Sequence, residues 1–286
     1  MMTGAATIHW GAEALWQAVE PLLPGFSVEI LPTVDSTNTE LMRRARAGRA
    51  ETVLLVAEQQ TAGRGRLGRN WVSGVGDSLM FSLGLSLAPR DWSGLSLAVG
   101  LSVAQSLQPD PGAGPRIGLK WPNDLWVEGD RKLAGILIET ASLPSSHGAH
   151  APRYVVIGVG INIRSRPGDG MRTPPACLQE IDGRLDAPTA LACIIPALAH
   201  QVLAFAGQGF APLAPAFARR DLLRGRMVQL SDGRGGLAEG VGPDGALLLR
   251  VGGETVAINS SEVSVRPAGD GLPARSAPQS APGMNG

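Results

Sequence analysis

The residues best suited to chemistry lie in two short segments, a basic glycine-rich loop at residues 63–69 and a lysine-bearing stretch at residues 120–139. In the loop, Arg64, Arg66 and Arg69 alternate with small residues, between Gln60 and Trp71. Glycine lets the backbone approach a ligand closely, and guanidinium groups bind phosphate or carboxylate in a bidentate manner. We therefore expect a mobile cationic flap over an anionic ligand; the alternative is a solvent-exposed basic turn.

The same loop matches the dinucleotide fingerprint G-x-G-x-x-G at residues 63–68. That fingerprint needs a strand directly before it and a helix directly after it. Here residues 59–62 separate the loop from the preceding strand pattern, and residues 69–74 are poor helix formers. A Walker A loop is also excluded, because no Gly-Lys-Ser/Thr follows. We expect neither kind of nucleotide site.

The second segment holds the only two lysines of the chain, Lys120 and Lys132, among 25 basic residues. Arginine is a planar fork that essentially never loses its proton, whereas lysine is a compact point charge. Because arginine is used everywhere else, the two lysines indicate positions where arginine would not serve.

Residues 120–124 (KWPND) end a strand in a rigid turn, in which proline fixes the backbone and Asn123 and Asp124 occupy the tip. Lys132 then begins the returning strand. An ammonium group on each side of a tip carboxylate could neutralise a phosphate and place a cation or an incoming amine. The alternative is a surface hairpin with one ordinary ion pair. The small residues Ala134 and Gly135 favour the first interpretation, because they indicate another molecule packing against the strand.

Length and composition limit the kind of protein that carries these segments. A chain of 286 residues can form one large core, or a large domain with a small companion. The formal net charge of zero argues against a dedicated nucleic-acid binder. Cys177 and Cys193 fit neither a disulfide framework nor a zinc site, and the N-terminus lacks a signal pattern, so we expect a cytoplasmic protein. Residues 190–206 are apolar but interrupted by Pro196, which predicts a buried alanine-rich helix instead of a membrane span.

The elements that must position the two segments alternate between strands and helices. We expect strands at residues 52–57 in the middle of a sheet, 78–87 as a half-buried strand, 133–139 and 154–163, with a hairpin over 117–127. Helices are predicted at residues 12–21, 92–107, 175–181, 189–206 and 212–224. A further helix opens at Ser36 and runs to about residue 47, with Thr37 and Glu40 spaced as a capping box.

After residue 224 the pattern changes to short strands at 227–230, 236–241, 246–251 and 255–258, separated by tight turns. Such regular short strands predict a small β-barrel. From residue 267 the composition of Pro, Ala, Gly and Ser predicts a disordered tail. We therefore expect a catalytic domain at 1–223, a small C-terminal domain at 224–267 and a tail at 268–286.

Five ordered motifs carry a resemblance to a known family: residues 36–38 (STN), 60–66 (QTAGRGR), 120–124 (KWPND), 131–137 (RKLAGIL) and 158–162 (GVGIN). Together they resemble the biotin protein ligases, the bacterial biotin–[acetyl-CoA-carboxylase] ligases, over about residues 30–165. The resemblance implies an α+β fold, with a mixed-sheet catalytic domain like that of class II synthetases and a C-terminal SH3-like β-barrel.

The resemblance also implies a two-step reaction. The carboxylate of biotin attacks the α-phosphate of ATP in the presence of Mg²⁺, giving biotinyl-5′-AMP and pyrophosphate. A lysine of the biotin carboxyl carrier protein then displaces AMP. Such chemistry depends on charge neutralisation and positioning more than on a protein nucleophile. Members of this family are monomers or homodimers.

Three sets of site residues follow from the resemblance. The catalytic set is Lys132, Arg66, Lys120 and Asp124, in which Arg66 retains the reactive intermediate and Asp124 lies near magnesium or the acceptor amine. The set implied for biotin is Ser36, Thr37, Asn38, Gln60, Arg64, Gly65, Arg66, Lys132, Gly135 and Gly158. The set implied for ATP is Arg66, Arg69, Trp71, Lys120, Asn123 and Lys132.

Three further expectations distinguish this chain from related classes. Some members of the family begin with a DNA-binding winged helix, but Ser36 lies too near the start for one, so we expect the monofunctional type without nucleic-acid or membrane binding. A lipoate ligase would need a long apolar slot and would lack the Gly-Arg-Gly-Arg run. A non-catalytic nucleotide-binding module would have no use for two lysines beside a tip carboxylate.

Overall fold

The computed structural model describes residues 8–72, 74–110, 117–128, 130–142, 151–168, 173–259 and 265–268. Its main sheet has seven strands in the spatial order β1-β2-β5-β9-β8-β7-β6. In chain order these are β1 (Ser27–Val34), β2 (Val53–Gln60), β5 (Ser78–Leu87), β6 (Ile117–Lys120), β7 (Asp124–Val127), β8 (Arg131–Ser142) and β9 (Arg153–Asn162). The β1–β2 pair is parallel and the other pairs are antiparallel, so the sheet is mixed, as predicted.

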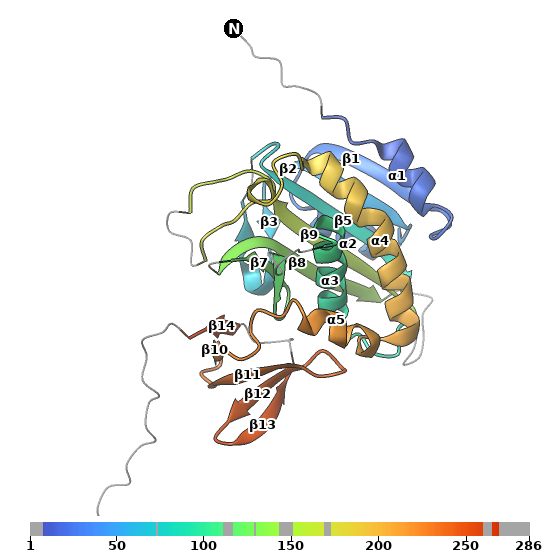
Figure 1. The fold of residues 1–286 in the computed structure, drawn as a ribbon. Helices are drawn as coiled ribbons and strands as arrows, with labels where there is room; N and C mark the ends of the chain where they lie inside the picture. Colours follow the sequence, from blue (N-terminus) through green and yellow to red (C-terminus); the bar gives the residue numbers. More distant parts are fainter. Residues whose placement is uncertain are drawn as a thin grey trace, which may run out of the picture.

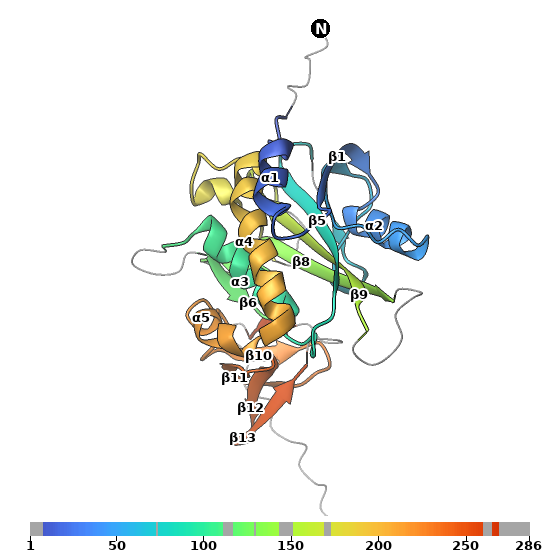
Figure 2. The ribbon, with the colours of Figure 1, turned by 90° about the vertical axis from the view of Figure 1, so that its right-hand side faces the viewer.

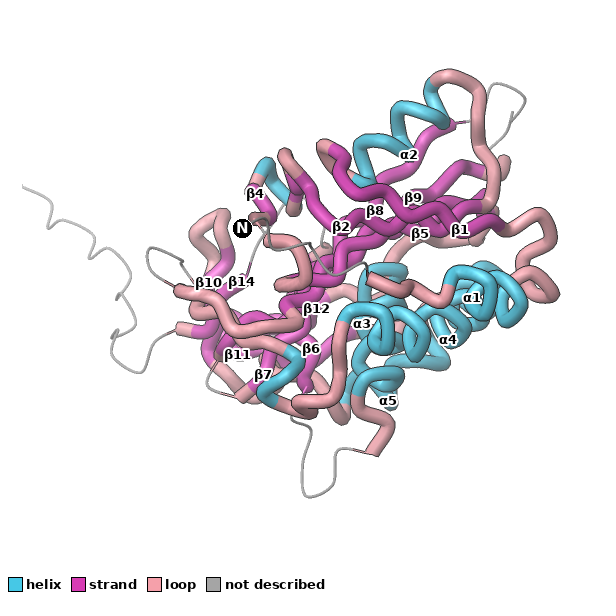
Figure 3. Tube along the Cα trace, turned by 90° about the horizontal axis from the view of Figure 1, so that it is seen from above, coloured by secondary structure: helices cyan, strands magenta, loops and turns pink. Residues whose placement is uncertain are grey.

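Helices cover both faces of this sheet. α1 (Ala12–Val19), α3 (Leu95–Leu107), α4 (Ala187–Gln208) and α5 (Ala214–Ala218) lie on one face, and α2 (Thr37–Arg46) lies alone on the other (Figures 1, 2 and 3). Alternate residues of a strand point to opposite faces. In β2, accordingly, Leu54 and Val56 join the large core under α1, α3 and α4, whereas Val53 and Leu55 join a small core under α2.

Burial differs from the prediction at β5. Its alternation of leucines with small residues predicts a half-buried strand, but every residue except Ser86 is buried. The prediction was wrong because the small residues do not face solvent. Ser82 faces the polar side of α2, and Gly84 leaves room for the Tyr154 ring, whose hydroxyl would lie 2.1 Å from a Cβ at that position.

The apolar run at residues 190–206 is part of α4, which packs against α3 and the sheet. In the described part of the chain, α4 is the one helix long and apolar enough to cross a membrane. Its side chains at Leu191, Ile194, Leu198 and Val202 are fully buried in the large core, which confirms the prediction of a core helix.

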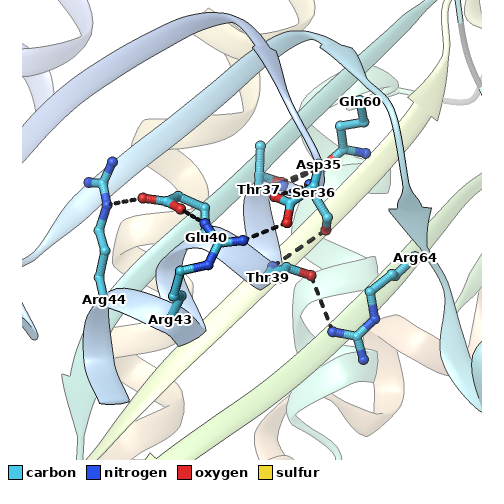
Figure 4. A network of polar contacts seen from close by, with 9 residues as sticks. All are labelled: Asp35, Ser36, Thr37, Thr39, Glu40, Arg43, Arg44, Gln60 and Arg64. Carbon is cyan, nitrogen blue, oxygen red and sulfur yellow. Dashed lines mark hydrogen bonds and ion pairs between the residues drawn. The ribbon is translucent and has the colours of Figure 1, made fainter. Parts of the chain in front are cut away.

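The predicted capping box of α2 is wrong in its residues. Ser36 is the N-cap, and its Oγ accepts a hydrogen bond of 3.4 Å from the Thr39 amide. Thr37 is already helical and donates its hydroxyl to Gln60, so it is not available as a cap. Glu40 instead forms ion pairs with Arg43 and Arg44 one turn later (Figure 4).

Two predicted helices are shorter than expected. Residues 175–181 contain only η2 (Leu178–Glu180), and the region of residues 212–224 contains only η3 (Ala211–Leu213) and the five-residue α5.

Beyond these helices, a five-stranded antiparallel sheet has the spatial order β13-β12-β11-β10-β14. Its strands are β10 (Met227–Leu230), β11 (Gly235–Val241), β12 (Leu247–Val251), β13 (Glu254–Ile258) and β14 (Val265–Pro267). In the described residues β13 and β14 are unpaired edges, so closure into a barrel is not confirmed. The predicted tail begins at residue 268, and its residues 269–286 lie outside the described residues.

Contacts join the small sheet to the main one. The Trp121 indole donates a hydrogen bond of 3.0 Å to the Gly245 carbonyl. Arg226 donates two hydrogen bonds, of 2.7 and 2.6 Å, to the Asp130 carboxylate in the turn between β7 and β8. The β6–β8 hairpin region is therefore held from both sides, by the main sheet and by the C-terminal sheet.

Candidate active site

A cavity of about 370 Å³ lies on the face of the main sheet that carries α2. Its size is in the usual range for small-molecule sites. Every site residue that the sequence assigns lines this cavity, so the fold brings the glycine-rich loop and the lysine stretch together. The described lining includes seven basic side chains and one acidic side chain, although the whole protein has no net charge. This imbalance favours an anionic ligand.

A β-bulge decides which side chains of β8 face the cavity. Leu125 pairs with Ala134 and Trp126 pairs with Lys132, so Leu133 is an extra residue in β8. Both Leu133 and Ala134 are buried in the large core, and the alternation restarts with Gly135 on the cavity side. Without the extra residue, Lys132 would point into the same core as Ala134.

The polar end of the cavity is a hydrogen-bonded floor at the start of α2. Gln60 Oε1 accepts two hydrogen bonds from Thr37, one from its amide at 2.8 Å and one from its hydroxyl at 3.1 Å. The Gln60 Nε2 group is then left with the weak acceptor Met80 Sδ at 3.4 Å. Ser82 Oγ lies 2.7 Å from both Thr37 Oγ1 and Asn38 Oδ1. The floor therefore presents donors and acceptors in fixed orientations.

Asn38 is a further member of this floor and is almost completely buried. Its Nδ2 group donates to the Leu137 carbonyl at 3.2 Å and to Glu139 Oε2 at 3.0 Å. A Cβ atom at position 158 would lie 2.0 Å from Asn38 Oδ1. Gly158 therefore makes room for the Asn38 amide. It also lines the cavity.

The glycine-rich loop folds back on itself as two short strands, β3 (Gly63–Arg64) and β4 (Asn70–Trp71), joined by the 3-10 turn η1 (Arg66–Gly68). Gly63 permits this close pairing, because a Cβ there would lie 2.4 Å from the Trp71 carbonyl oxygen. Arg66 is partly buried and donates a hydrogen bond of 3.3 Å to Asn123 Oδ1 at the hairpin tip. The loop therefore already contacts the lysine stretch through Arg66.

The Arg64 side chain does not extend over the cavity, as would be expected of a residue that closes over the ligand. Its guanidinium group lies against α2, 3.3 Å from Thr39 Oγ1 (Figure 4), and 3.3 Å from Glu139 Oε1. Arg64 lines the cavity, but this side chain fastens the flap to the sheet and to α2.

The lysine stretch forms the cationic wall of the cavity. Lys132 Nζ lies 2.7 Å from Asp124 Oδ1, and Asp124 pairs across the hairpin with Lys120. Lys120 is only 7% exposed, with its ammonium 5.2 Å from the centre of the Trp126 ring. Burial lowers the pKa of Lys120 to about 8, against the opposing effect of the Asp124 carboxylate. Of the two ammonium groups predicted beside the tip carboxylate, that of Lys132 contacts Asp124 directly, and that of Lys120 lies over the Trp126 ring.

Asn162, the last residue of the 158–162 motif, fixes the backbone of Lys132, a role that the motif alone did not predict. Asn162 donates hydrogen bonds to the carbonyls of Lys132, at 3.1 Å, and Ala176, at 2.9 Å. The Lys132 amide in turn donates to the Pro174 carbonyl at 2.8 Å. Asn162 therefore positions the reactive end of β8, and only the long-range pairing of β8 with β9 brings it there.

The opposite end of the cavity is lined by aromatic and basic side chains. Trp71 packs over Gly160, where a Cβ would lie 2.7 Å from the indole ring, and Arg166 lies 5.5 Å from the Trp71 ring centre. Arg266 of β14 reaches the cavity from the C-terminal sheet. Trp126, Arg166 and Arg266 were not identified from the sequence, because each stands outside the recognised motifs. They extend the positive lining beyond the predicted residues.

The described lining of the cavity contains few side chains that could bind a divalent metal ion. Among the described residues of the cavity, Asp124 has the one acidic side chain, and its Oδ1 is already paired with Lys132. No cluster of three potential ligands occurs in the part of the chain that the structure describes. Magnesium can bind through one carboxylate when substrate phosphates supply further oxygens. The residues present therefore fit an ion that is carried by a nucleotide, for which Asp124 would be the protein ligand.

The arrangement combines a neutral hydrogen-bonding floor with a cationic wall in one cavity. A ligand with a polar amide-like head and an anionic tail would satisfy both ends. The basic groups would stabilise a second anionic molecule beside that tail and the charge that develops between the two. The described lining provides no hydroxyl or thiol with an adjacent base that would mark covalent catalysis by the protein.

Comparison with known proteins gives a consistent family. Residues 30–162 match the model of the biotin/lipoate A/B protein ligase family. The chain is 37% identical to the bifunctional ligase/repressor BirA of Escherichia coli, over 86% of this chain and 76% of that protein. It is 32% identical to biotin–[acetyl-CoA-carboxylase] ligase of Mycobacterium tuberculosis, over 82% of this chain and 88% of that protein. A solved biotin protein ligase from Aquifex aeolicus in complex with biotin and ATP has a TM-score of 0.68 at 28% identity, covering 84% and 99% of the two chains.

Proposed function

The chain belongs to the biotin/lipoate A/B protein ligase family, and we propose that it is a biotin–[acetyl-CoA-carboxylase] ligase. It would activate biotin with ATP to biotinyl-5′-AMP and transfer the biotinyl group to one lysine of a biotin carboxyl carrier protein. The observation that carries this proposal is the polar floor and the cationic wall at opposite ends of one cavity.

The polar floor favours biotin over lipoate. The ureido ring of biotin has one carbonyl acceptor and two N–H donors, which suit the weakly bound Gln60 Nε2 donor and the oxygens of Ser36 and Asn38. The dithiolane ring of lipoate offers no comparable hydrogen-bonding groups, so it would leave the second hydrogen of Gln60 Nε2 and the remaining lone pairs of these oxygens without a partner. Such a loss discriminates strongly between ligands.

In the first step, a carboxylate oxygen of biotin bonds to the α-phosphorus of ATP, and the bond from that phosphorus to the pyrophosphate oxygen breaks. Lys132 would neutralise both the biotin carboxylate and the α-phosphate, which otherwise repel each other. Arg66, held at the hairpin tip by Asn123, would stabilise charge on the phosphate and close the flap. Trp71 and Arg69 would lie at the nucleotide side.

In the second step, the neutral lysine amine of the carrier protein attacks the acyl carbon, the carbon–oxygen bond to AMP breaks, and the amine loses a proton. Asp124 lies on the wall beside Lys120 and Lys132, where its carboxylate would accept a hydrogen bond from the incoming amine. Gly135 leaves room for the Lys132 side chain, because a Cβ there would lie 3.2 Å from the Lys132 ammonium.

Several further properties belong to this proposal. Magnesium would arrive with ATP, and Asp124 would supply its protein ligand. The unit at residues 1–223 would hold both substrates, whereas β14 of the C-terminal unit would add Arg266 at the nucleotide end. We also propose a cytoplasmic enzyme without operator binding.

The test is transfer of radiolabelled biotin to a purified carrier domain in the presence of ATP, with radiolabelled lipoate in a parallel reaction. We expect ATP-dependent labelling of one carrier lysine with biotin and background labelling with lipoate. Efficient lipoate transfer, or the lack of biotin-dependent exchange between ATP and pyrophosphate, would refute the proposal.

A further inference from the structure

Glu139 lies directly behind the polar floor, on the cavity face of β8 and two residues beyond Leu137. It contacts two site residues at once. Its Oε2 accepts a hydrogen bond of 3.0 Å from Asn38 Nδ2, and its Oε1 lies 3.3 Å from Arg64 Nη2. One carboxylate therefore connects the floor of the cavity with the flap above it.

The contact with Asn38 determines what the floor presents to a ligand. The Asn38 Nδ2 hydrogens go to Leu137 O and Glu139, while Asn38 Oδ1 lies 2.7 Å from Ser82 Oγ. If the amide turned over, its oxygen would face a carbonyl and a carboxylate, both of which are acceptors. Glu139 thus fixes Asn38 with its oxygen toward Ser82. Because the Glu139 carboxylate is charged, it accepts a stronger hydrogen bond from Asn38 than the neutral Leu137 carbonyl does.

The contact with Arg64 acts on the flap. The Arg64 side chain is 48% exposed, so its ion pair with Glu139 adds little to overall stability. A second bond to Thr39, the residue after Asn38, holds the same guanidinium against α2 (Figure 4). Arg64 therefore ties β3, the first strand of the flap, to β8 through Glu139 and to α2 through Thr39.

We propose that Glu139 is a positioning residue for biotin binding, which orients the Asn38 amide through one oxygen and fastens the flap through Arg64 with the other. The inference rests on the proposed function, since it assumes that biotin occupies the floor. Glu139 does not act on ATP, because its contacts lie at the floor and at the outer side of the flap.

The test compares two variants of equal side-chain length in the full chain. Glu139→Gln keeps an oxygen that accepts the Asn38 bond, whereas Glu139→Met replaces both oxygens by a thioether, which is only a weak acceptor. We expect Glu139→Met to weaken biotin binding, measured by calorimetry and as KM in pyrophosphate exchange, by about tenfold or more. The kcat and the KM for ATP should stay within about twofold, because a loss of ground-state binding raises KM alone.

Glu139→Gln should retain biotin affinity within about threefold, since only the weak exposed pair is lost. Adding Arg64→Gln to Glu139→Gln should cause no further loss beyond Arg64→Gln alone, because the two residues act as one pair. Glu239→Gln is the matched control, since Glu239 forms an exposed ion pair with Arg250 in the C-terminal sheet. It should behave as the wild type.

The outcomes separate this inference from the proposed function. If the wild type binds biotin and Glu139→Met binds it equally well, the positioning role is refuted and the ligase proposal stands. If the wild type itself fails to bind biotin, the ligase proposal is refuted and this inference with it. If Glu139→Met lowers kcat and Tm while leaving the biotin KM unchanged, the residue is only structural, which also overturns the inference.

Discussion

Replacing Lys120 by methionine should make the protein more stable and less active. Lys120 is 7% exposed, and burial lowers its pKa from the ordinary 10.5 to about 8. One pKa unit corresponds to about 1.4 kcal/mol, so holding this charge inside the fold costs roughly 3 kcal/mol at neutral pH. Lys120→Met should therefore raise the free energy of unfolding at pH 7 by up to about 3 kcal/mol, while it slows adenylate formation.

The pH dependence gives this prediction its sharpest form. Between about pH 8 and pH 10.5 the unfolded chain keeps a proton on Lys120 that the folded wild type has released. The free energy of unfolding of the wild type consequently rises with pH across this range. The advantage of Lys120→Met should shrink over the same range and vanish near pH 10.5. Few other groups interfere, because the chain has two lysines and one tyrosine.

Urea denaturation of both proteins at several pH values from 7 to 10.5 measures this difference. The buried Tyr154, whose pKa is raised to about 12, and Cys177, whose pKa is also raised, contribute equally to both proteins and cancel. Lys132→Met is the matched control, because it removes an ammonium that is paired with Asp124 at 2.7 Å and should bring no stabilisation. A stability difference that stays constant from pH 7 to 10.5 would refute the reasoning.

Further predictions concern the site. Gly158→Ala should weaken biotin binding by about tenfold or more, because the new Cβ would lie 2.0 Å from Asn38 Oδ1, whereas Gly207→Ala in α4, with free space around it, should leave the Kd unchanged and raise Tm. A wild-type Kd for Gly158→Ala in a calorimetric titration would contradict this. Lys132→Arg should lower biotin-dependent pyrophosphate exchange by about tenfold or more, since a longer planar fork cannot replace a compact charge; equal rates would remove the argument for lysine. Arg66→Gly should release biotinyl-AMP and label lysines of a bystander protein, and unchanged bystander labelling would disprove its retaining role. A gel shift with the duplex of a biotin-operon promoter should show no binding, and tight biotin-dependent binding would overturn the monofunctional assignment.

Much of the fold could be predicted because apolar patterns are local. The apolar runs that became β2, β5 and β9 were identified within a few residues, and so was the hairpin that displays Asn123 and Asp124. The two chemical segments were found by residue type and spacing. Their meeting in one cavity was expected from the resemblance, and the geometry places them there.

The supporting contacts could not be predicted, because they depend on pairings between distant strands. Strict alternation along β8 would place Lys132 in the core, and only the extra residue Leu133 reverses this. Glu139 and Ser82 carry no spacing signal, since their partners at Asn38 and Arg64 lie 44 or more residues away. β14 was missed because it is three residues long and pairs with β10 across more than thirty residues.

Two tryptophans that line the cavity, Trp71 and Trp126, give the protein an optical property. The indole nitrogens of Trp71 and Trp126 are buried and have no hydrogen-bond partner within the described residues, and Trp126 lies beside the Lys120 ammonium. Indole emission responds to nearby charge and to hydrogen bonding, so each arriving substrate would change its intensity and wavelength. The successive stages of a catalytic cycle could then be followed in real time by stopped-flow fluorescence, without attaching a dye.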